Sequence, residues 1–273
     1  MLQHVWLIPV GFLLGAYGTI IGAGGGFLLV PLLLFAYPEE APDTVTSISL
    51  AVVFFNALSG TLAYSRQKRI DYRSGLIFSA ATVPGAILGA LSTNLFSRRL
   101  FDGMFGALMI LATALLVLRP TKKAKPNPLG SSQYQRRVVT EANGTEHAFF
   151  YNLPLGIGIS VVVGYISTLL GVGGGFIHVP ALVHLLNFPV HIATATSQFI
   201  LAVMALTGTG VHLLTGTFTH GFRRTLMLGI GVLVGAQMGA YFSERLRGDW
   251  IIRGLAAALG LVGLRLVWRA LAL

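Results

Sequence analysis

The chain contains no cysteine and few charged residues. Cysteine is absent from all 273 positions, which excludes disulfides, thiol chemistry and thiolate metal sites. Only 10% of the residues are charged, whereas a soluble globular domain carries about 25%. Because so few charges cannot cover a water-exposed surface, and 54% of the residues are hydrophobic, lipid must be the solvent for much of the chain. The length suits a bundle of roughly eight to ten membrane helices and half-helices.

Carboxylates are missing from the middle of every apolar run. The acidic residues fall in loops or near the ends of the expected spans: Glu39, Glu40, Asp43, Asp71, Asp102, Glu141, Glu146, Glu244 and Asp249. Cation transporters and carboxylate proton relays place such a group inside the membrane. The sequence therefore disfavours a metal-ion or sodium pathway and leaves anions or neutral solutes. It also carries no zinc, phosphate-loop or nucleophile-elbow pattern, so we predict no metal, no cofactor and no enzymatic activity.

The net charge of +10 would suggest a nucleic-acid partner in a soluble protein. Here the basic residues lie mostly in loops between apolar runs, where membrane topology and anionic lipid explain them. We therefore expect a lipid bilayer as the partner and no nucleic acid. Part of the positive excess can also attract an anionic substrate.

The apolar runs predict an all-α polytopic membrane protein with two transmembrane halves and one polar linker. The expected elements of the first half, residues 1–118, are Val5–Ile21, Phe27–Tyr37, Thr46–Tyr64, Gly75–Phe96 and Leu100–Leu118. Those of the second half, residues 148–273, are Phe149–Leu170, Phe176–Phe188, Thr194–Leu214, Thr225–Phe242 and Ile251–Leu271. The linker, residues 119–147, is basic, which is typical of a cytoplasmic loop. By the same rule Gln67–Tyr72 is cytoplasmic and the acidic loop Glu39–Asp43 is external.

Two glycine runs, Gly22–Phe27 and Gly171–Phe176, interrupt apolar segments. Glycine permits backbone conformations closed to other residues and lets a ligand approach the main chain. Inside a bilayer, freed N–H and C=O groups are tolerated only within protein or beside a wet cavity. Matching interruptions in two halves indicate a transporter's binding site, whereas close packing of small residues is the simpler alternative. We predict helices broken at both runs.

The two halves repeat each other at a nearly constant spacing. Gly171 follows Gly22 by 149 residues, and the same offset joins Phe27 to Phe176. One residue is then added, and an offset of 150 joins the pairs Thr44 and Thr194, Thr46 and Thr196, Ser47 and Ser197, Gly60 and Gly210, Gly85 and Gly235, and Gly89 and Gly239. These identities predict an internal duplication.

The orientation of the two repeats depends on how many times each crosses the membrane. An even number of crossings makes the repeats parallel, and an odd number inverts them. Basic loop residues mildly favour the parallel arrangement, because it places Arg223 and Arg224 inside with Arg66. If Phe27–Tyr37 and Phe176–Phe188 are re-entrant, the repeats are inverted.

The helix N-termini expected after the glycine runs are the first candidate site. A helix N-terminus presents unpaired N–H groups and a partial positive charge, which favour an anion. Two such ends that converge near the midplane would bind an anion without lysine or arginine. The candidate residues are Gly24, Gly25, Gly26, Phe27, Gly173, Gly174, Gly175 and Phe176.

Hydroxyl-rich sequences open the span that follows each glycine run. Thr46 and Ser47 stand in the first, and Thr196, Ser197 and Gln198 stand in the second. Such side chains can cap a helix or donate to the oxygens of an anion, and both interpretations stay open.

Two further polar residues are candidates. Asn56 lies nine residues beyond Ser47 and can face a pocket or form a hydrogen bond between helices. His178 lies three residues beyond Gly175 and is the first candidate for a coupling proton, with a structural histidine as the alternative.

The paired GxGGGF-x3-P runs, each followed by a Thr/Ser-rich start of a span, resemble the sulfite exporter TauE/SafE family across residues 5–271. The resemblance implies movement of sulfur-containing anions such as sulfite, sulfoacetate, sulfolactate or aromatic sulfonates. It also implies coupling to the proton gradient and no bound cofactor. The site residues that it implies are Gly24, Gly25, Gly26, Thr46, Ser47, Gly173, Gly174, Gly175, Thr196 and Ser197.

The sequence thus predicts a secondary transporter of small sulfur-containing anions in the bacterial inner membrane. The alternatives are an anion-permeable channel and a transporter of another small organic anion. An intramembrane enzyme or an assembly scaffold is disfavoured, because no buried acid, cysteine or metal cluster is expected. A homodimer is compatible with the apolar surface.

Overall fold

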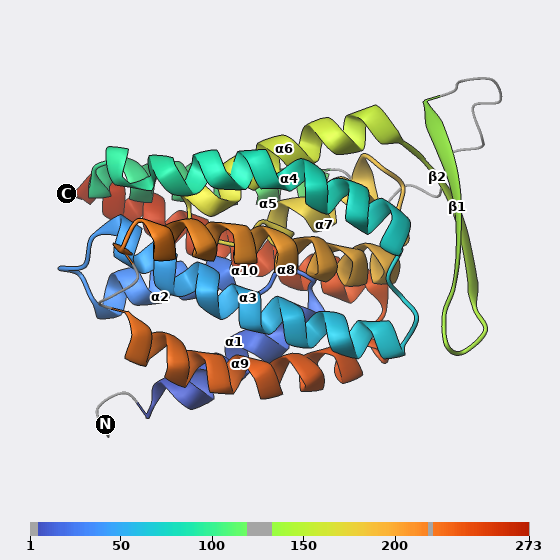
Figure 1. Ribbon diagram of the computed structural model, residues 1–273, viewed down its shortest axis with the longest axis horizontal. Helices are drawn as coiled ribbons and strands as arrows, with labels where there is room; N and C mark the ends of the chain where they lie inside the picture. Colours follow the sequence, from blue (N-terminus) through green and yellow to red (C-terminus); the bar gives the residue numbers. More distant parts are fainter. Residues whose placement is uncertain (1–4, 119–132, 218–220, 273) are drawn as a thin grey trace.

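Ten α-helices form a bundle among the described residues, and a β-hairpin stands at one end of it (Figure 1). The computed structural model describes residues 5–118, 133–217 and 221–272. The first half contains α1 (Leu7–Ile20), α2 (Gly26–Ala36), α3 (Pro42–Arg66), α4 (Tyr72–Ser92), the 3₁₀ helix η2 (Thr93–Leu95) and α5 (Arg98–Leu118). The second contains β1 (Tyr134–Thr140), β2 (Glu146–Asn152), α6 (Leu153–Leu169), α7 (Gly175–His184), α8 (Val190–Leu214), α9 (Phe222–Ser243) and α10 (Gly248–Ala272).

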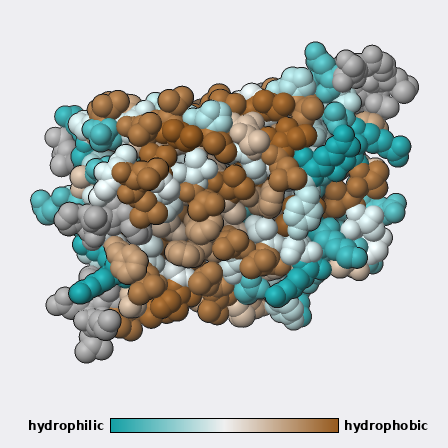
Figure 2. Space-filling view, in the orientation of Figure 1, coloured by the Kyte–Doolittle hydropathy of each residue, from teal (hydrophilic) through white to brown (hydrophobic). Residues whose placement is uncertain are grey.

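The surface of the bundle is that of a membrane protein. Figure 2 shows hydrophobic side chains over the middle of one face and hydrophilic side chains gathered at its two ends. Among the described residues, five helices are long and apolar enough to cross a membrane, namely α3, α4, α8, α9 and α10. The helices α1, α2, α6 and α7 are shorter, with 14, 11, 17 and 10 residues. The prediction of an all-α polytopic membrane protein is confirmed.

The short helices form two re-entrant pairs. The pair α1–α2 enters and leaves at the end of the bundle opposite the hairpin, and the pair α6–α7 enters and leaves at the hairpin end (Figure 1). The second return is fixed by contacts: α6 follows β2 directly, and the Asn187 amide after α7 donates to the Phe150 carbonyl of β2 at 3.4 Å. Each pair therefore turns back within the bundle at its glycine run.

The two halves of the chain run in opposite directions. The helices α3 and α8 pack antiparallel, because Gly60 lies beside Gln198 while Gly208 lies beside Leu50. The mild preference for parallel repeats was wrong. Arg224 forms an ion pair with Glu40 at 2.7 Å, in the acidic loop at the end opposite the hairpin (Figure 1). The basic loop residues gave the wrong orientation because each re-entrant pair contributes no membrane crossing. Each half then has an odd number of crossings, which inverts the repeats.

Glycines let the outer helices approach closely. A β-carbon on Gly15 of α1 would lie 2.7 Å from the Cα atom of Val232 in α9, and Gly231 and Gly235 of α9 lie against α1 main chain in return. The same pattern joins α4 and α6, where Gly164 meets Thr82 main chain. Small residues favour such close contacts in membranes, where lipid provides no hydrophobic drive between helices. The matched contacts support the proposed duplication.

The hairpin spans the boundary between the expected linker, residues 119–147, and the expected second half. Residues 119–132 lie outside the described part, but β1 and β2 pair antiparallel from Tyr134 opposite Asn152 to Thr140 opposite Glu146. The expected span from Phe149 begins later, at Leu153, because Phe149 belongs to β2. The phenyl ring of Phe149 packs against Phe188, with ring centroids 4.4 Å apart, so the strand closes over the end of the bundle.

Ion pairs hold the hairpin on the turn between α3 and α4. Arg137 of β1 donates to both carboxylate oxygens of buried Asp71, with a shortest distance of 2.7 Å. This hydrogen bond raises the pKa of the Arg137 guanidinium. Arg69 pairs with Glu141 at 2.9 Å, and both side chains are buried. The two segments predicted to be cytoplasmic therefore lie together on one face.

Removal of the Arg137 side chain should loosen the hairpin. Arg137→Ala leaves the Asp71 carboxylate buried without its cation, which is costly in a poorly solvated position. We expect amide exchange in β1 and β2 to accelerate by at least about tenfold, or about 1.4 kcal/mol of docking free energy. Arg136→Ala, on the exposed face of the same strand, is the control and should leave exchange unchanged. Equal exchange in both variants would show that the ion pair does not dock the hairpin.

Single cysteines test the re-entrant, inverted arrangement, because the native chain has none. Glu39, Asn143 and Thr215 are exposed in three different loops. With the hairpin face inside the cell, a membrane-impermeant maleimide should label Glu39→Cys and Thr215→Cys in intact cells, and Asn143→Cys only after permeabilisation. A parallel arrangement would instead give Thr215→Cys the same protection as Asn143→Cys.

Candidate functional site

Both glycine runs end one helix and begin another. Gly25 and Gly174 precede α2 and α7 as N-caps in the left-handed conformation, with φ of 75° and 80°. Gly22 and Gly171 also have positive φ, at 72° and 69°. Because side chains other than that of glycine are strained in this region, the sequence GxGGG is what allows the chain to reverse within a few residues. The predicted breaks are confirmed, and α2 and α7 begin at Gly26 and Gly175.

The two runs meet at the centre of the protein. Gly26 lies directly against the carbonyl of Val172, and Gly175 lies against the carbonyl of Gly22. The residues of both runs, up to Phe27 and Phe176, are buried. The predicted convergence of the two runs is therefore present in the structure, with α3 and α8 crossing beside them.

Thr194 of α8 and Thr46 of α3 make matching contacts with the two glycine runs, so the structure matches these two helices at an offset of 148 and not at the 150 expected from the sequence. A β-carbon on Gly22 would lie 2.7 Å from the Cα atom of Thr194 in α8. A β-carbon on Gly171 would lie at the same distance from the Cα atom of Thr46 in α3. The start of each long helix thus packs on the glycine run of the other half.

Buried N–H groups at the two runs lack partners. Among the described residues, no hydrogen bond is made to the N–H groups of Gly25, Gly26 and Phe27, nor to those of Gly173–Phe176. In contrast, the N–H groups of Ala23 and Gly24 reach the Gly18 carbonyl at 2.8 and 3.1 Å. Buried N–H groups without a partner are rare and costly. These groups lie at the N-termini of α2 and α7, where the helix dipoles add positive potential.

The side chains nearest to the runs carry no charge. Val53 of α3 and Leu201 of α8 pack on Gly24, while Met204 and Ser167 lie 2.7 and 2.8 Å from the position of a Gly174 β-carbon. The Ser167 hydroxyl is buried without a partner among the described residues. These side chains fill the space between the runs, so an anion can enter only if they move.

Within the part of the chain that the structure describes, carboxylates are absent from this centre. The buried acids Asp71, Asp102 and Glu141 lie near the ends of the bundle and each lies close to an arginine. An anion at the glycine runs would therefore meet N–H groups and hydroxyls without a competing negative charge.

The predicted hydroxyls have different environments. Thr46 and Ser47 donate to carbonyls of their own helix turn, those of Asp43 and Thr44, at 2.9 and 2.8 Å. Ser197 donates to the Gly22 carbonyl at 3.0 Å and so contacts the opposite glycine run.

The remaining hydroxyl of the second cluster faces the end of the bundle. Thr196 accepts from the backbone N–H of Asp71 at 3.1 Å. Of the four predicted hydroxyls, Ser197 therefore forms the direct hydrogen bond to a glycine run, and Thr196 links α8 to the turn that carries the hairpin.

Asn56 and Gln198 share a buried polar cluster with Thr19. The Thr19 hydroxyl donates to Asn56 Oδ1 at 3.0 Å, and Gln198 Nε2 donates to the Gly18 carbonyl at 3.4 Å. Tyr64 closes the cluster by donating to the Thr19 carbonyl at 2.8 Å. Neither Thr19 nor Tyr64 was predicted, and the one sequence signal was the position of Thr19 three residues before Gly22.

His178 is buried against α6. Its Nε2 lies 3.3 Å from the Ser160 hydroxyl, and its Nδ1 has no partner among the described residues. The imidazole sits in the first turn of α7. The position is compatible with either a structural or a proton-carrying histidine.

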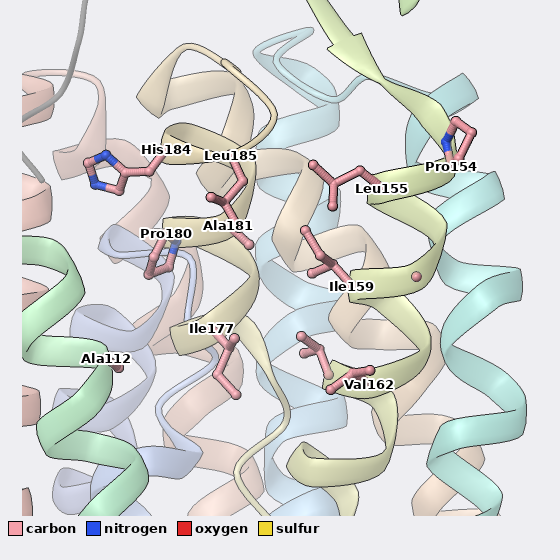
Figure 3. A pocket seen from close by; sticks show the side chains of 12 residues that line it. Ala112, Pro154, Leu155, Ile159, Val162, Ile177, Pro180, Ala181, His184 and Leu185 are labelled. Carbon is pink, nitrogen blue, oxygen red and sulfur yellow. The ribbon is translucent and has the colours of Figure 1, made fainter. Parts of the chain in front are cut away.

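A groove on the outside of the bundle is a different kind of site. It lies between α6, α7 and α5, has a volume of about 780 Å³, and is lined by apolar side chains such as Leu155, Val162 and Ile177 (Figure 3). Of the described residues that line it, His184 is the one with a titratable side chain. This lining offers an anion no set of donors.

Comparisons with known proteins agree with this architecture. Residues 7–266 match the family described as "Sulfite exporter TauE/SafE". The chain is 33% identical to "Probable membrane transporter protein YunE" of Bacillus subtilis over 99% of each chain. It is 29% identical to "Probable membrane transporter protein YdhB" of the same organism over 88% of each chain. A probable membrane transporter of Methanocaldococcus jannaschii is 24% identical over 94% of this chain and 93% of its own.

No solved structure matches the chain at a significant level. The family match covers nearly the whole chain and every helix that builds the glycine-run crossing. The family and the curated relatives are membrane transporters and not enzymes. The chain is therefore a multi-pass membrane transport protein that belongs to the sulfite exporter TauE/SafE family.

Proposed function

We propose that this protein is a secondary transporter of small sulfur-containing anions, such as sulfite, sulfoacetate or related sulfonates, in the inner membrane of a bacterium. The observation that carries the proposal is the pair of helix N-termini at the glycine runs, whose N–H groups have no partner among the described residues. The family name supports sulfite as the first substrate to test.

A sulfite or sulfonate group suits such a site. Its three oxygens spread one or two negative charges over several acceptors, and each oxygen can accept from more than one N–H group. The N–H groups of Gly25–Phe27 and Gly174–Phe176 would approach the anion from opposite sides. The Ser167 hydroxyl, which has no partner among the described residues, would add a donor. The Ser197 hydroxyl would add another if it left the Gly22 carbonyl.

Alternating access follows from the inverted arrangement. The pair α1–α2 packs on α9 of the other half, and the pair α6–α7 packs on α4, so each glycine run is carried by helices from both halves. Val53 and Leu201 close the centre from α3 and α8. Relative movement of these two helices would open the runs to one face and then to the other.

Proton coupling would use His178 in this proposal. Its Nδ1, unpartnered among the described residues, could take up a proton when the neighbouring helices move, and Ser160 would hold Nε2. Loss of pH-gradient dependence in His178→Gln, with uptake down a sulfite gradient preserved, would support this role. Unchanged gradient dependence would make the histidine structural.

Reconstituted protein should take up labelled sulfite, and Gly174→Ala should lower the rate by about tenfold or more. The added methyl would crowd Met204 and Ser167 at the start of α7. Gly144→Ala in the hairpin turn is the matched control, because Gly144 also has a positive φ, 86°, but no described neighbour within 4 Å of an added methyl. Backbone strain should cost both variants roughly 1–2 kcal/mol of stability. A lower transport rate in Gly174→Ala alone would therefore result from crowding at the glycine run and not from strain.

The outcomes discriminate between the possible functions. Counterflow of labelled sulfite identifies a carrier, whereas an open anion channel shows none. Absence of transport of sulfite and sulfonates under either sign of proton gradient would contradict the proposed function. Equal rates for Gly174→Ala and Gly144→Ala would mean that the glycines serve helix packing alone.

A further inference from the structure

We propose that Thr19, Asn56 and Gln198 form a hydroxyl-binding subsite next to the glycine runs, so that the protein prefers hydroxylated alkylsulfonates to unsubstituted or carboxylated ones. This inference rests on the proposed function and specifies the organic part of the substrate.

The three side chains come from three helices and are fully buried. Thr19 ends the first part of the broken pair, Asn56 lies in α3 and Gln198 lies in α8, and each has an exposed fraction of 0%. Thr19 and Gln198 lie beside Gly60 of α3: a β-carbon there would lie 3.3 Å from the Thr19 hydroxyl oxygen and 3.4 Å from the Gln198 amide carbon. These distances are tight, so a larger residue at position 60 would press on both side chains, and Asn56 joins them through its hydrogen bond with Thr19.

The cluster keeps one donor and one acceptor unused. Among the described residues, Asn56 Nδ2 and Gln198 Oε1 have no hydrogen-bond partner. The orientation of Gln198 is determined by chemistry, because the Gly18 carbonyl can only accept and therefore faces Nε2. Burial of two such groups without partners is destabilising, and a ligand that satisfies both would remove this cost.

A hydroxyl complements these two groups chemically, because it accepts a hydrogen bond from an amide N–H and donates one to an amide oxygen. A carboxylate can only accept, so it would use the amide donor but face the lone pairs of the Gln198 oxygen. A methyl group would leave both amide groups unpaired.

The subsite adjoins the proposed anion site through the main chain. The Gly18 carbonyl accepts from both Gly24 N–H and Gln198 Nε2, at 3.1 and 3.4 Å. Ser197, the neighbour of Gln198, donates to the Gly22 carbonyl. A short molecule with a sulfonate at the glycine runs could therefore place a hydroxyl beside Asn56 and Gln198.

The polar cluster exists on one side of the crossing. In the structure α8 repeats α3 at an offset of 148, because Gly208 lies beside Thr168 and Leu50 as Gly60 lies beside Thr19 and Gln198. Gln198 therefore corresponds to Leu50 and Asn56 corresponds to Met204, and both of these apolar side chains are buried. Two identical halves would surround the substrate with similar side chains. A substrate whose two ends differ chemically explains why the amide groups occur in one half and apolar side chains in the other.

The test compares three anions of similar size in proteoliposomes: 2-hydroxyethanesulfonate, sulfoacetate and propanesulfonate. Uptake of each labelled anion is measured, together with its competition against labelled sulfite. The variants are Gln198→Ile and Asn56→Leu, which remove the two amide groups, and Gly60→Ala, which crowds Thr19 and Gln198. Gly210→Ala in α8 is the control, because a methyl added there would meet no described neighbour within 4 Å.

We expect the wild type to take up 2-hydroxyethanesulfonate at least about tenfold more efficiently than the other two sulfonates. Gln198→Ile, Asn56→Leu and Gly60→Ala should each reduce that preference by about tenfold, and Gly210→Ala should retain it. The ratio between anions is the readout, so a lower amount of folded protein does not imitate the effect.

Equal uptake of the three sulfonates by the wild type, or a preference that survives all three variants, would overturn the subsite while leaving the anion site standing. A preference for sulfoacetate would also overturn it, because a carboxylate does not fit the free acceptor. If neither sulfite nor any sulfonate is transported, the proposed function itself fails.

Discussion

The structure depends on one constraint, namely that a bilayer provides no water to satisfy a broken helix. Each glycine run frees backbone N–H groups in the middle of the protein, where an unpaired polar group is costly. The cost is tolerable only inside protein, and here the two runs lie against each other with α3 and α8 beside them. The same arrangement brings together two helix N-termini whose N–H groups have no partner among the described residues. The side chains around them are uncharged, and an oxyanion is stabilised by such donors and by the helix dipoles.

The packing of the outer helices follows from this centre. A re-entrant pair cannot cross the membrane, so it must be held by neighbours along its length. Glycines in α1 and α9, and in α4 and α6, bring these helices close enough for van der Waals contact between main chains. The contacts exchange partners between the halves, with α1 on α9 and α6 on α4. Each half therefore holds the broken pair of the other.

Local chemistry made the breaks and the lack of central carboxylates predictable. The GxGGG runs require positive φ, and their offset is visible in the sequence alone. The return of each pair was not predictable, because whether a chain continues or turns back after a break is decided by packing against distant helices. The hairpin was hidden by the basic composition of β1, and the cluster of Thr19, Asn56 and Gln198 joins residues far apart in the chain.

Binding of an oxyanion between the two glycine runs can be observed directly in a structure of the protein with selenite, an analogue of sulfite whose selenium is located by anomalous scattering. We expect a selenium peak between Gly25–Phe27 and Gly173–Phe176, with selenite oxygens in hydrogen-bonding range of these backbone N–H groups. A saturating selenite concentration that gives peaks only at the surface arginines, with none at the crossing of the runs, would contradict the proposed anion site.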